Sequence, residues 1–200
     1  MRKHIKDFVG LCADRLNLQG PVYDFGAMLQ GGQDPALGSL CPCFPGRQFW
    51  AADFMPGPGV EIVLDLHHID LPDETAGTAI SVETFEHVQF PWIAIKEMHR
   101  ILKPDGVCIL SSVMHFPIHN FPDDYWRYTP SGFRTLLEYA GFQGIWVDWA
   151  GSKAFPHTVV GLGFKGRGLP GNVGALEKEL RDNRILWQFE PGYTQQQCPF

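Results

Sequence analysis

Apolar side chains recur every three or four residues in several parts of the chain. Near the start, this stripe predicts an amphipathic helix over residues 3–18, which Gly20-Pro21 ends. The same spacing predicts helices over residues 91–103 and 129–141, and a last helix that Asn172 caps. We therefore expect four helices of ordinary length, separated by shorter elements.

Short apolar runs, several of which end in an acid or a glycine, lie between these helices. They predict seven strands, over residues 22–26, 48–53, 61–65, 78–82, 107–113, 145–149 and 158–164. Strands that alternate with helices imply one doubly wound, mostly parallel α/β sheet with helices on both faces. The last two strands have no helix between them, so we expect an antiparallel strand pair at one edge.

The composition is that of one folded domain. The chain has 200 residues, of which 44% are hydrophobic and 19% charged, which excludes a disordered tail or a coiled coil. We expect a core domain over residues 1–165 and a C-terminal helical extension with a tail, residues 166–200, packed on the same domain. The apolar tail residues either form a partner surface, as in a homodimer, or cover their own sheet (Ile185, Leu186, Trp187 and Phe189).

The net charge, the hydropathy and the cysteine content limit the kinds of partner and the cellular compartment that we expect. A net charge of −6 offers no field for a nucleic acid. No apolar run approaches the about 18 residues that a membrane span needs, and the polar N-terminus is unlike a signal peptide. The five cysteines agree with a reducing compartment, and Cys41-Pro42-Cys43 has a poor spacing for zinc. We expect a cytoplasmic protein.

Acids and a glycine close three of the predicted strands. Asp24-Phe25-Gly26 ends the first, and Asp53 and Asp65 end the next two. In a doubly wound sheet the ligand lies beyond the carboxyl ends of the strands, where backbone amides and an acid can meet a ribose and its neighbours. The ordered set is typical of a site for a nucleoside-containing cofactor.

In order and spacing, these motifs resemble the class I S-adenosylmethionine-dependent methyltransferases, over residues 22–165. Residues 83–88 (ETFEHV) resemble the motif after the family's fourth strand, and residues 101–106 (ILKPDG) the turn before its fifth. Residues 117–119 and 124–130 (PIH and DYWRYTP) are similar to a small bacterial type-11-like branch. The resemblance implies a Rossmann-like fold and the cofactor S-adenosyl-L-methionine.

The resemblance also implies which residues hold the cofactor. Asp53 is then the ribose acid, and Asp65 and Leu66 meet the adenine. The cofactor-binding residues implied are Asp24, Gly26, Asp53, Phe54, Asp65, Leu66 and Glu83. In the first motif, Met28 and Gln30 occupy slots where the family has glycine, and Gly31-Gly32 follow. This departure leaves an alternative open, a catalytically inactive methyltransferase-like binding or scaffolding protein.

Histidines, acids and aromatic residues crowd the segment after the fifth strand, where this fold carries its acceptor loop. We expect catalytic roles for His119, His115 and Asp124, with a histidine as general base for a hydroxyl acceptor. Substrate-binding roles are expected for His87, Tyr125, Arg127 and Tyr128. Arg127 could instead bridge to a neighbouring aspartate, and the tyrosines could pack the loop down. Pro117 between the histidines argues against a helical metal site, so no metal is predicted.

These observations predict methyl transfer to a small-molecule or saccharide-type acceptor, at oxygen or nitrogen, by in-line displacement at the sulfonium. The sequence leaves the acceptor's identity open. A nicotinamide dehydrogenase is disfavoured, because Gly26-Ala27-Met28 does not supply the G-x-G-x-x-G that such enzymes carry.

Overall fold

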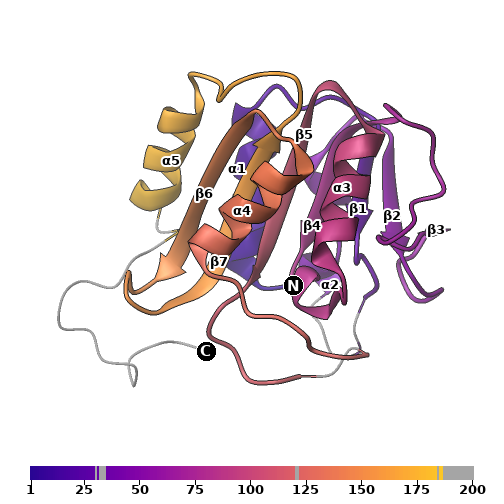
Figure 1. Ribbon diagram of the computed structural model, residues 1–200, viewed down its shortest axis with the longest axis horizontal. Coiled ribbons are helices and arrows are strands. Elements are labelled where there is room, and N and C mark those ends of the chain that lie inside the picture. Colours follow the sequence, from indigo (N-terminus) through magenta and orange to yellow (C-terminus); the bar gives the residue numbers. More distant parts are fainter. Residues whose placement is uncertain (30, 32–34, 120–121, 184, 187–200) are drawn as a thin grey trace.

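Seven strands form one twisted sheet in the order β3-β2-β1-β4-β5-β7-β6 (Figure 1). The computed structural model describes residues 1–29, 31, 35–119, 122–183 and 185–186. Strands β1 to β5 run parallel, and β7 is antiparallel to both β5 and the edge strand β6. This confirms the predicted α/β fold and its antiparallel pair at one edge. The strands are β1 (Val22–Phe25), β2 (Phe49–Asp53), β3 (Ile62–Val63), β4 (Ala76–Val82), β5 (Leu102–Val113), β6 (Gly144–Gly151) and β7 (Pro156–Phe164).

Helices cover both faces of the sheet, as predicted. α1 and α5 pack into a core on one face, whereas α3 and α4 pack into a core on the other (Figure 1). The helical elements are α1 (Lys3–Arg15), α2 (Pro35–Gly38), α3 (Pro91–Ile101), α4 (Pro130–Ala140), α5 (Val173–Asp182) and the 3-10 turns η1 (Cys41–Cys43) and η2 (Phe85–His87).

The central strand β5 shows why the sheet needs both layers. Val107 and Ile109 face the core under α1, and Cys108 and Leu110 face the core under α3. Side chains alternate between faces along a strand, so a strand that is apolar at every position is stable only when both faces are covered. The apolar run from Val107 to Leu110 of β5 therefore fits the place of this strand inside the sheet.

The ends of α4 follow the predicted signals. The Thr129 hydroxyl accepts a hydrogen bond from the Gly132 amide at 3.0 Å, and Gly141 ends the helix with φ of 98°. The prediction that the Asn172 side chain caps the last helix was wrong, because this side chain makes no capping hydrogen bond. Its amide instead donates to the Arg15 carbonyl oxygen at 2.7 Å, which ties the start of α5 to the end of α1.

Several strands differ in length from the prediction, β3 and β5 among them. The run over residues 61–65 shortens to β3, because Asp65 enters a turn in which its carbonyl oxygen accepts from the His68 amide at 3.0 Å. β5 begins at Leu102 rather than at residue 107, because Leu102 already pairs with Ala76 of β4. The preceding helix, predicted to reach residue 103, therefore ends at Ile101.

The C-terminal extension continues the core under α1. Val173, Leu176 and Leu180 of α5, together with Leu186, are buried in it. Trp187 and Phe189 lie outside the described residues. The division at residue 165 remains a prediction. None of the helices in the described part of the chain has the length and apolarity to cross a bilayer.

Candidate functional site

A cavity of about 680 Å³ opens at the carboxyl ends of β1 and β4, where the order of the strands reverses. Small-molecule pockets typically measure roughly 300–1,000 Å³. All seven residues predicted to hold a cofactor line this cavity, together with three of those predicted for the acceptor. In chain order the ten are Asp24, Gly26, Asp53, Phe54, Asp65, Leu66, Glu83, His87, His119 and Tyr125.

Gly26 lies where the end of β1 meets the end of β4. Its φ is 85°, and a methyl group on it would lie 2.1 Å from the Thr84 hydroxyl oxygen. Its amide donates to the Ala52 carbonyl oxygen of β2 at 2.9 Å. Only glycine has the conformation and the volume for this position, so the chain there passes close to the cavity.

Asp53, at the end of β2, joins two loops at the floor of the cavity. Its carboxylate accepts hydrogen bonds from the Met28 amide at 3.1 Å and from the Met55 amide at 3.4 Å. Met28, which stands in a glycine slot, lines the cavity, and its side chain packs against Gly57. A carboxylate can accept about four hydrogen bonds, so Asp53 retains capacity for ligand hydroxyls. Gln30, in the other glycine slot, lies outside the described residues.

Asp24, near the end of β1, is buried. Burial, together with the negative charge of Asp53, raises the pKa of Asp24 to about 7. The carboxyl group therefore holds its proton for part of the time near neutral pH. A positively charged ligand beside it would favour the ionised form.

An apolar wall and an exposed acid form the side of the cavity beyond β2 and β3. Leu66 is buried there, whereas Phe54 keeps 46% of its surface exposed. The Asp65 carboxylate accepts from the His67 amide at 2.8 Å and lies at the same distance from the His67 ring nitrogen Nδ1. This combination suits a flat apolar ring with polar atoms at its edge.

Glu83, the first residue after β4, is paired with the N-terminal segment. Arg2 donates to its carboxylate through the backbone amide, at 2.8 Å, and through the guanidinium. Arg2 holds the pKa of Glu83 below its ordinary value, despite burial that acts in the opposite direction. Met1 and Arg2 both line the cavity. The sequence analysis missed Arg2, since 81 residues separate it from its partner and no local pattern marks it.

Two histidines meet at the end of the cavity that the acceptor loop covers. His87 follows β4 and His119 follows β5, and their Nε2 atoms lie 3.1 Å apart. The buried carboxylate of Glu86, to which the sequence analysis assigned no role, also lines the cavity here. Tyr125 also lines the cavity, and its hydroxyl donates to Asp123 at 3.1 Å.

Two of the predicted catalytic residues, His115 and Asp124, do not face the cavity. His115 is outside the described lining of the cavity, and its ring packs against Phe155 at 4.3 Å between centroids. The Asp124 side chain is 1% exposed and binds the Arg127 guanidinium, which holds the pKa of Asp124 well below its ordinary value. Asp124 also accepts from the His119 amide at 2.9 Å, so it positions this histidine rather than facing the cavity.

Two predicted substrate-binding residues, Arg127 and Tyr128, also lie outside the described lining of the cavity. The Arg127 guanidinium donates to Asp124 at 2.7 Å and to the Phe116 carbonyl oxygen at 3.2 Å, which is the bridging alternative. Tyr128 is buried, and its hydroxyl donates to the Phe85 carbonyl oxygen at 3.0 Å. Both side chains hold the acceptor loop in place instead of lining the cavity.

The lining of the cavity fits the cofactor that the resemblance implies. Five carboxylates line the cavity among the described residues, and their negative charge suits a sulfonium. Asp53 has free acceptor capacity for ribose hydroxyls, and Leu66 and Phe54 provide an apolar wall for adenine. The bare backbone at Gly26 lets a ligand approach closely.

Comparison with known families agrees with this geometry. Residues 49–110, from β2 into β5, match the family described as methyltransferase domain. A search of curated proteins finds no significant match.

Solved structures share the fold over most of the chain. A possible histamine N-methyltransferase from Thermotoga maritima, described as S-adenosylmethionine-dependent, is 19% identical, with a TM-score of 0.56 over 80% of this chain and 91% of its own. A 1,6-didemethyltoxoflavin-N1-methyltransferase from Burkholderia thailandensis, with bound 1,6-didemethyltoxoflavin and S-adenosylhomocysteine, is 19% identical, with a TM-score of 0.62 over 82% and 79%. An S-adenosylmethionine-dependent methyltransferase from Mesorhizobium loti is 15% identical, with a TM-score of 0.58 over 80% and 98%.

The sequence match covers residues 49–110, and the solved structures show the fold. Together with the cavity at the strand ends, they make the chain similar to S-adenosylmethionine-dependent methyltransferases.

Proposed function

We propose that the chain transfers the methyl group of S-adenosylmethionine to a small-molecule acceptor that carries a hydroxyl or amine and binds in the same cavity. One observation carries this proposal. The seven residues that the family resemblance assigns to the cofactor line one cavity, and this cavity continues to His87, His119 and Tyr125 under the acceptor loop.

Each part of the cavity then has its own task. Asp53 binds the ribose hydroxyls, Leu66 packs against the adenine, and the loop at Gly26 approaches the methionine portion. Asp24, once ionised, faces the positive end of the cofactor. When bound, S-adenosylmethionine supplies a methyl group already activated on a positively charged sulfur. The protein therefore has to align the acceptor in line with that bond and exclude water.

The acceptor lies at the end of the cavity that carries the two histidines. A hydroxyl acceptor has to lose its proton there, and His119 is the predicted histidine that reaches the cavity, whereas His115 does not. A small acceptor agrees with the solved neighbour from Burkholderia thailandensis, which holds a small molecule together with S-adenosylhomocysteine.

Titration calorimetry with S-adenosylmethionine and S-adenosylhomocysteine tests the proposal. We expect micromolar binding by the wild type. Asp53→Ala should weaken it about tenfold or more, since a hydrogen bond to a charged group contributes about 1.5–3 kcal/mol. The control is Asp182→Ala, which removes an exposed carboxylate outside the cavity lining.

Each outcome decides something. Equal affinities of the wild type and Asp53→Ala would remove Asp53 as the ribose acid. No binding of either ligand by the folded wild type would overturn the proposed function and favour a binding or scaffolding role.

A further inference from the structure

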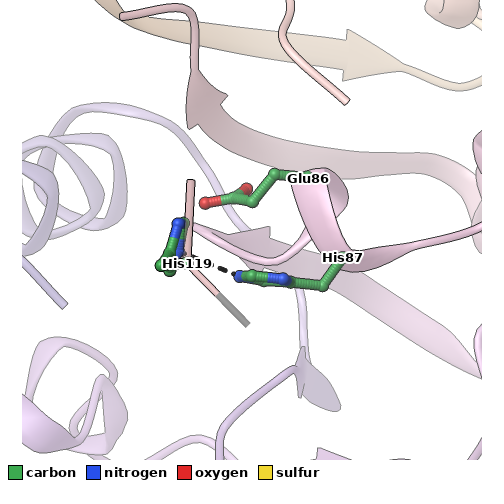
Figure 2. Close-up of side chains that lie close together, drawn as sticks. All are labelled: Glu86, His87 and His119. Atoms are coloured by element: carbon green, nitrogen blue, oxygen red, sulfur yellow. Dashed lines mark hydrogen bonds between the residues drawn. The ribbon is translucent and has the colours of Figure 1, made fainter. Parts of the chain in front are cut away.

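Glu86, His87 and His119 form a compact cluster of side chains at the acceptor end of the cavity (Figure 2). Glu86 and His87 come from the 3-10 turn η2 after β4, and His119 comes from the loop after β5. One carboxylate oxygen and two imidazole nitrogens lie within 4.8 Å of one another. All three side chains border the cavity, so a ligand there could reach them directly.

The hydrogen bonds of the two Nδ1 atoms determine whether the Nε2 atoms, which face the cluster, carry a proton. His87 Nδ1 lies 2.6 Å from the Asp123 carbonyl oxygen, which can only accept, so this nitrogen carries a proton. His119 Nδ1 lies 3.2 Å from the Pro117 carbonyl oxygen and 3.2 Å from the Asp124 carboxylate, so it also donates. In their neutral forms both rings therefore present an Nε2 lone pair to each other.

Two lone pairs at this distance need a positive charge between them. The Nε2 atoms are 3.1 Å apart. A dashed line joins the two rings in Figure 2. Without an added proton on one ring, the contact is repulsive. Nitrogen ligands at about 2.0–2.1 Å from one tetrahedral zinc ion would lie about 3.3 Å apart, so the observed spacing suits a shared cation.

Glu86 supplies the negative charge that such a cation needs. Its side chain is almost completely buried, and one carboxylate oxygen accepts from the Ser112 hydroxyl at 2.6 Å. Its backbone carbonyl oxygen accepts from the Tyr125 amide at 2.8 Å, which holds the acceptor loop against η2. The other nearby acids are already engaged, since Glu83 pairs with Arg2 and Asp124 with Arg127.

We propose that Glu86, His87 and His119 bind one divalent transition-metal ion of the zinc type. Two histidines and one carboxylate leave a coordination position open, here toward the cavity. Hydrogen bonds from the far imidazole nitrogens to a carbonyl and a carboxylate are the usual support of metal-bound histidines. His87 and His119 belong to two different loops and are 32 positions apart in the sequence. The spacing of histidines within the acceptor loop alone therefore did not predict this metal site.

The ion also narrows the acceptor, in a step that rests on the proposed function. A cation here would bind an acceptor hydroxyl and lower its pKa, so that the proton leaves to solvent. The oxygen lone pair then forms the bond to the methyl carbon, the carbon–sulfur bond breaks, and its electron pair stays on sulfur. The cluster therefore favours an O-methylated acceptor over an amine, with the histidines as ligands rather than as the base.

Metal binding can be measured without any methyl transfer. The protein is stripped with a chelator and titrated with Zn²⁺ by calorimetry and with Co²⁺ by visible absorption. We expect one equivalent to bind, with a Co²⁺ spectrum of nitrogen and oxygen ligands in low coordination. His87→Ala and His119→Ala should each weaken binding at least about 100-fold. The matched control His115→Ala, a histidine of the same loop outside the cavity lining, should bind as the wild type does.

Circular dichroism checks that each variant is folded. The test uses the two histidine variants because replacing the buried Glu86 could itself unfold the protein. Wild-type binding no tighter than millimolar, or equal affinities in the wild type and both histidine variants, would overturn the metal site. S-adenosylmethionine binding is titrated in parallel with chelator present. If the wild type does not bind S-adenosylmethionine, the proposed function is overturned. The metal site is decided separately, by the Zn²⁺ and Co²⁺ titrations alone.

Discussion

Individual acids at the strand ends have the same sequence context but different surroundings. Asp65 is exposed and paired with His67, whereas Asp53 is buried and held by backbone amides. Asp24 is buried beside Asp53, and its pKa is raised to about 7. The sequence marks all three as candidates, but only burial and neighbouring charge separate their chemistry.

The raised pKa of Asp24 makes the stability of the domain depend on pH. Between its ordinary pKa of 3.8 and about 7, the folded chain keeps a proton that the unfolded chain has released. Folding therefore takes up a proton, and the free energy of unfolding should fall as the pH rises through this window. Asp24→Asn should remove that part of the fall.

Urea unfolding of the wild type and Asp24→Asn at several pH values between about 4 and 8 measures the effect. This pH range spans the ordinary and the raised pKa of Asp24. Contributions of other groups are shared and cancel in the difference between the two proteins. Parallel curves for the two would show that Asp24 titrates at its ordinary pKa.

At the scale of elements, the acceptor loop between β5 and α4 is held at several points. The guanidinium of Arg127 binds Asp124, Tyr128 binds the Phe85 carbonyl oxygen, and Tyr125 binds the Glu86 carbonyl oxygen. These contacts place His119 at the cavity without a regular secondary structure. The loop therefore depends on a few charged and aromatic anchors.

Removing the Arg127 anchor should destabilise the domain. Arg127→Ala leaves the buried Asp124 without its counterion, which should cost about 2–3 kcal/mol, less than a fully buried pair because the arginine is partly exposed. Arg127→Lys keeps the charge but loses the two-pronged geometry, so it should recover part of the loss. Urea unfolding measures both. Unchanged stability with a raised KM for the acceptor would instead restore the predicted substrate-binding role.

At the scale of the whole molecule, the C-terminal helix is part of the core that supports the site. α5 packs on α1, and Glu179 of α5 binds Arg15 at 2.8 Å. α1 is preceded by Arg2, which reaches Glu83 at the cavity. The extension therefore stabilises the helix whose start forms one wall of the site.

Shortening a buried side chain of α5 should reduce the stability of the whole domain. Leu180→Ala removes a fully buried side chain and should cost about 2–4 kcal/mol. Leu169→Ala, at a residue that is 48% exposed, is the control and should change stability by less than about 1 kcal/mol. A single unfolding transition that shifts as a unit in Leu180→Ala is expected by both fluorescence and circular dichroism. A separate transition for α5 would make the extension an independent unit.

Local pattern was enough to predict most of the architecture. The apolar spacing predicts α1, α3 and α4 to within a few residues, and the acids at the ends of three strands mark the rim of the sheet. These features are predictable because helix and strand periods, caps and turns depend on neighbours within a few positions. The exceptions were local as well, since β3 was cut short by the turn at Asp65.

The sequence alone thus determined a doubly wound sheet, a rim of acids and the likeness to methyltransferases. Only the tertiary structure decided which side chains face the cavity. It turned Arg127, Tyr128 and Asp124 into anchors of a loop, and it brought Arg2 to Glu83 and His119 to His87. Such pairs join positions 32 to 81 residues apart, and no local period records them, because they form only when separate strand ends meet at one edge of the sheet.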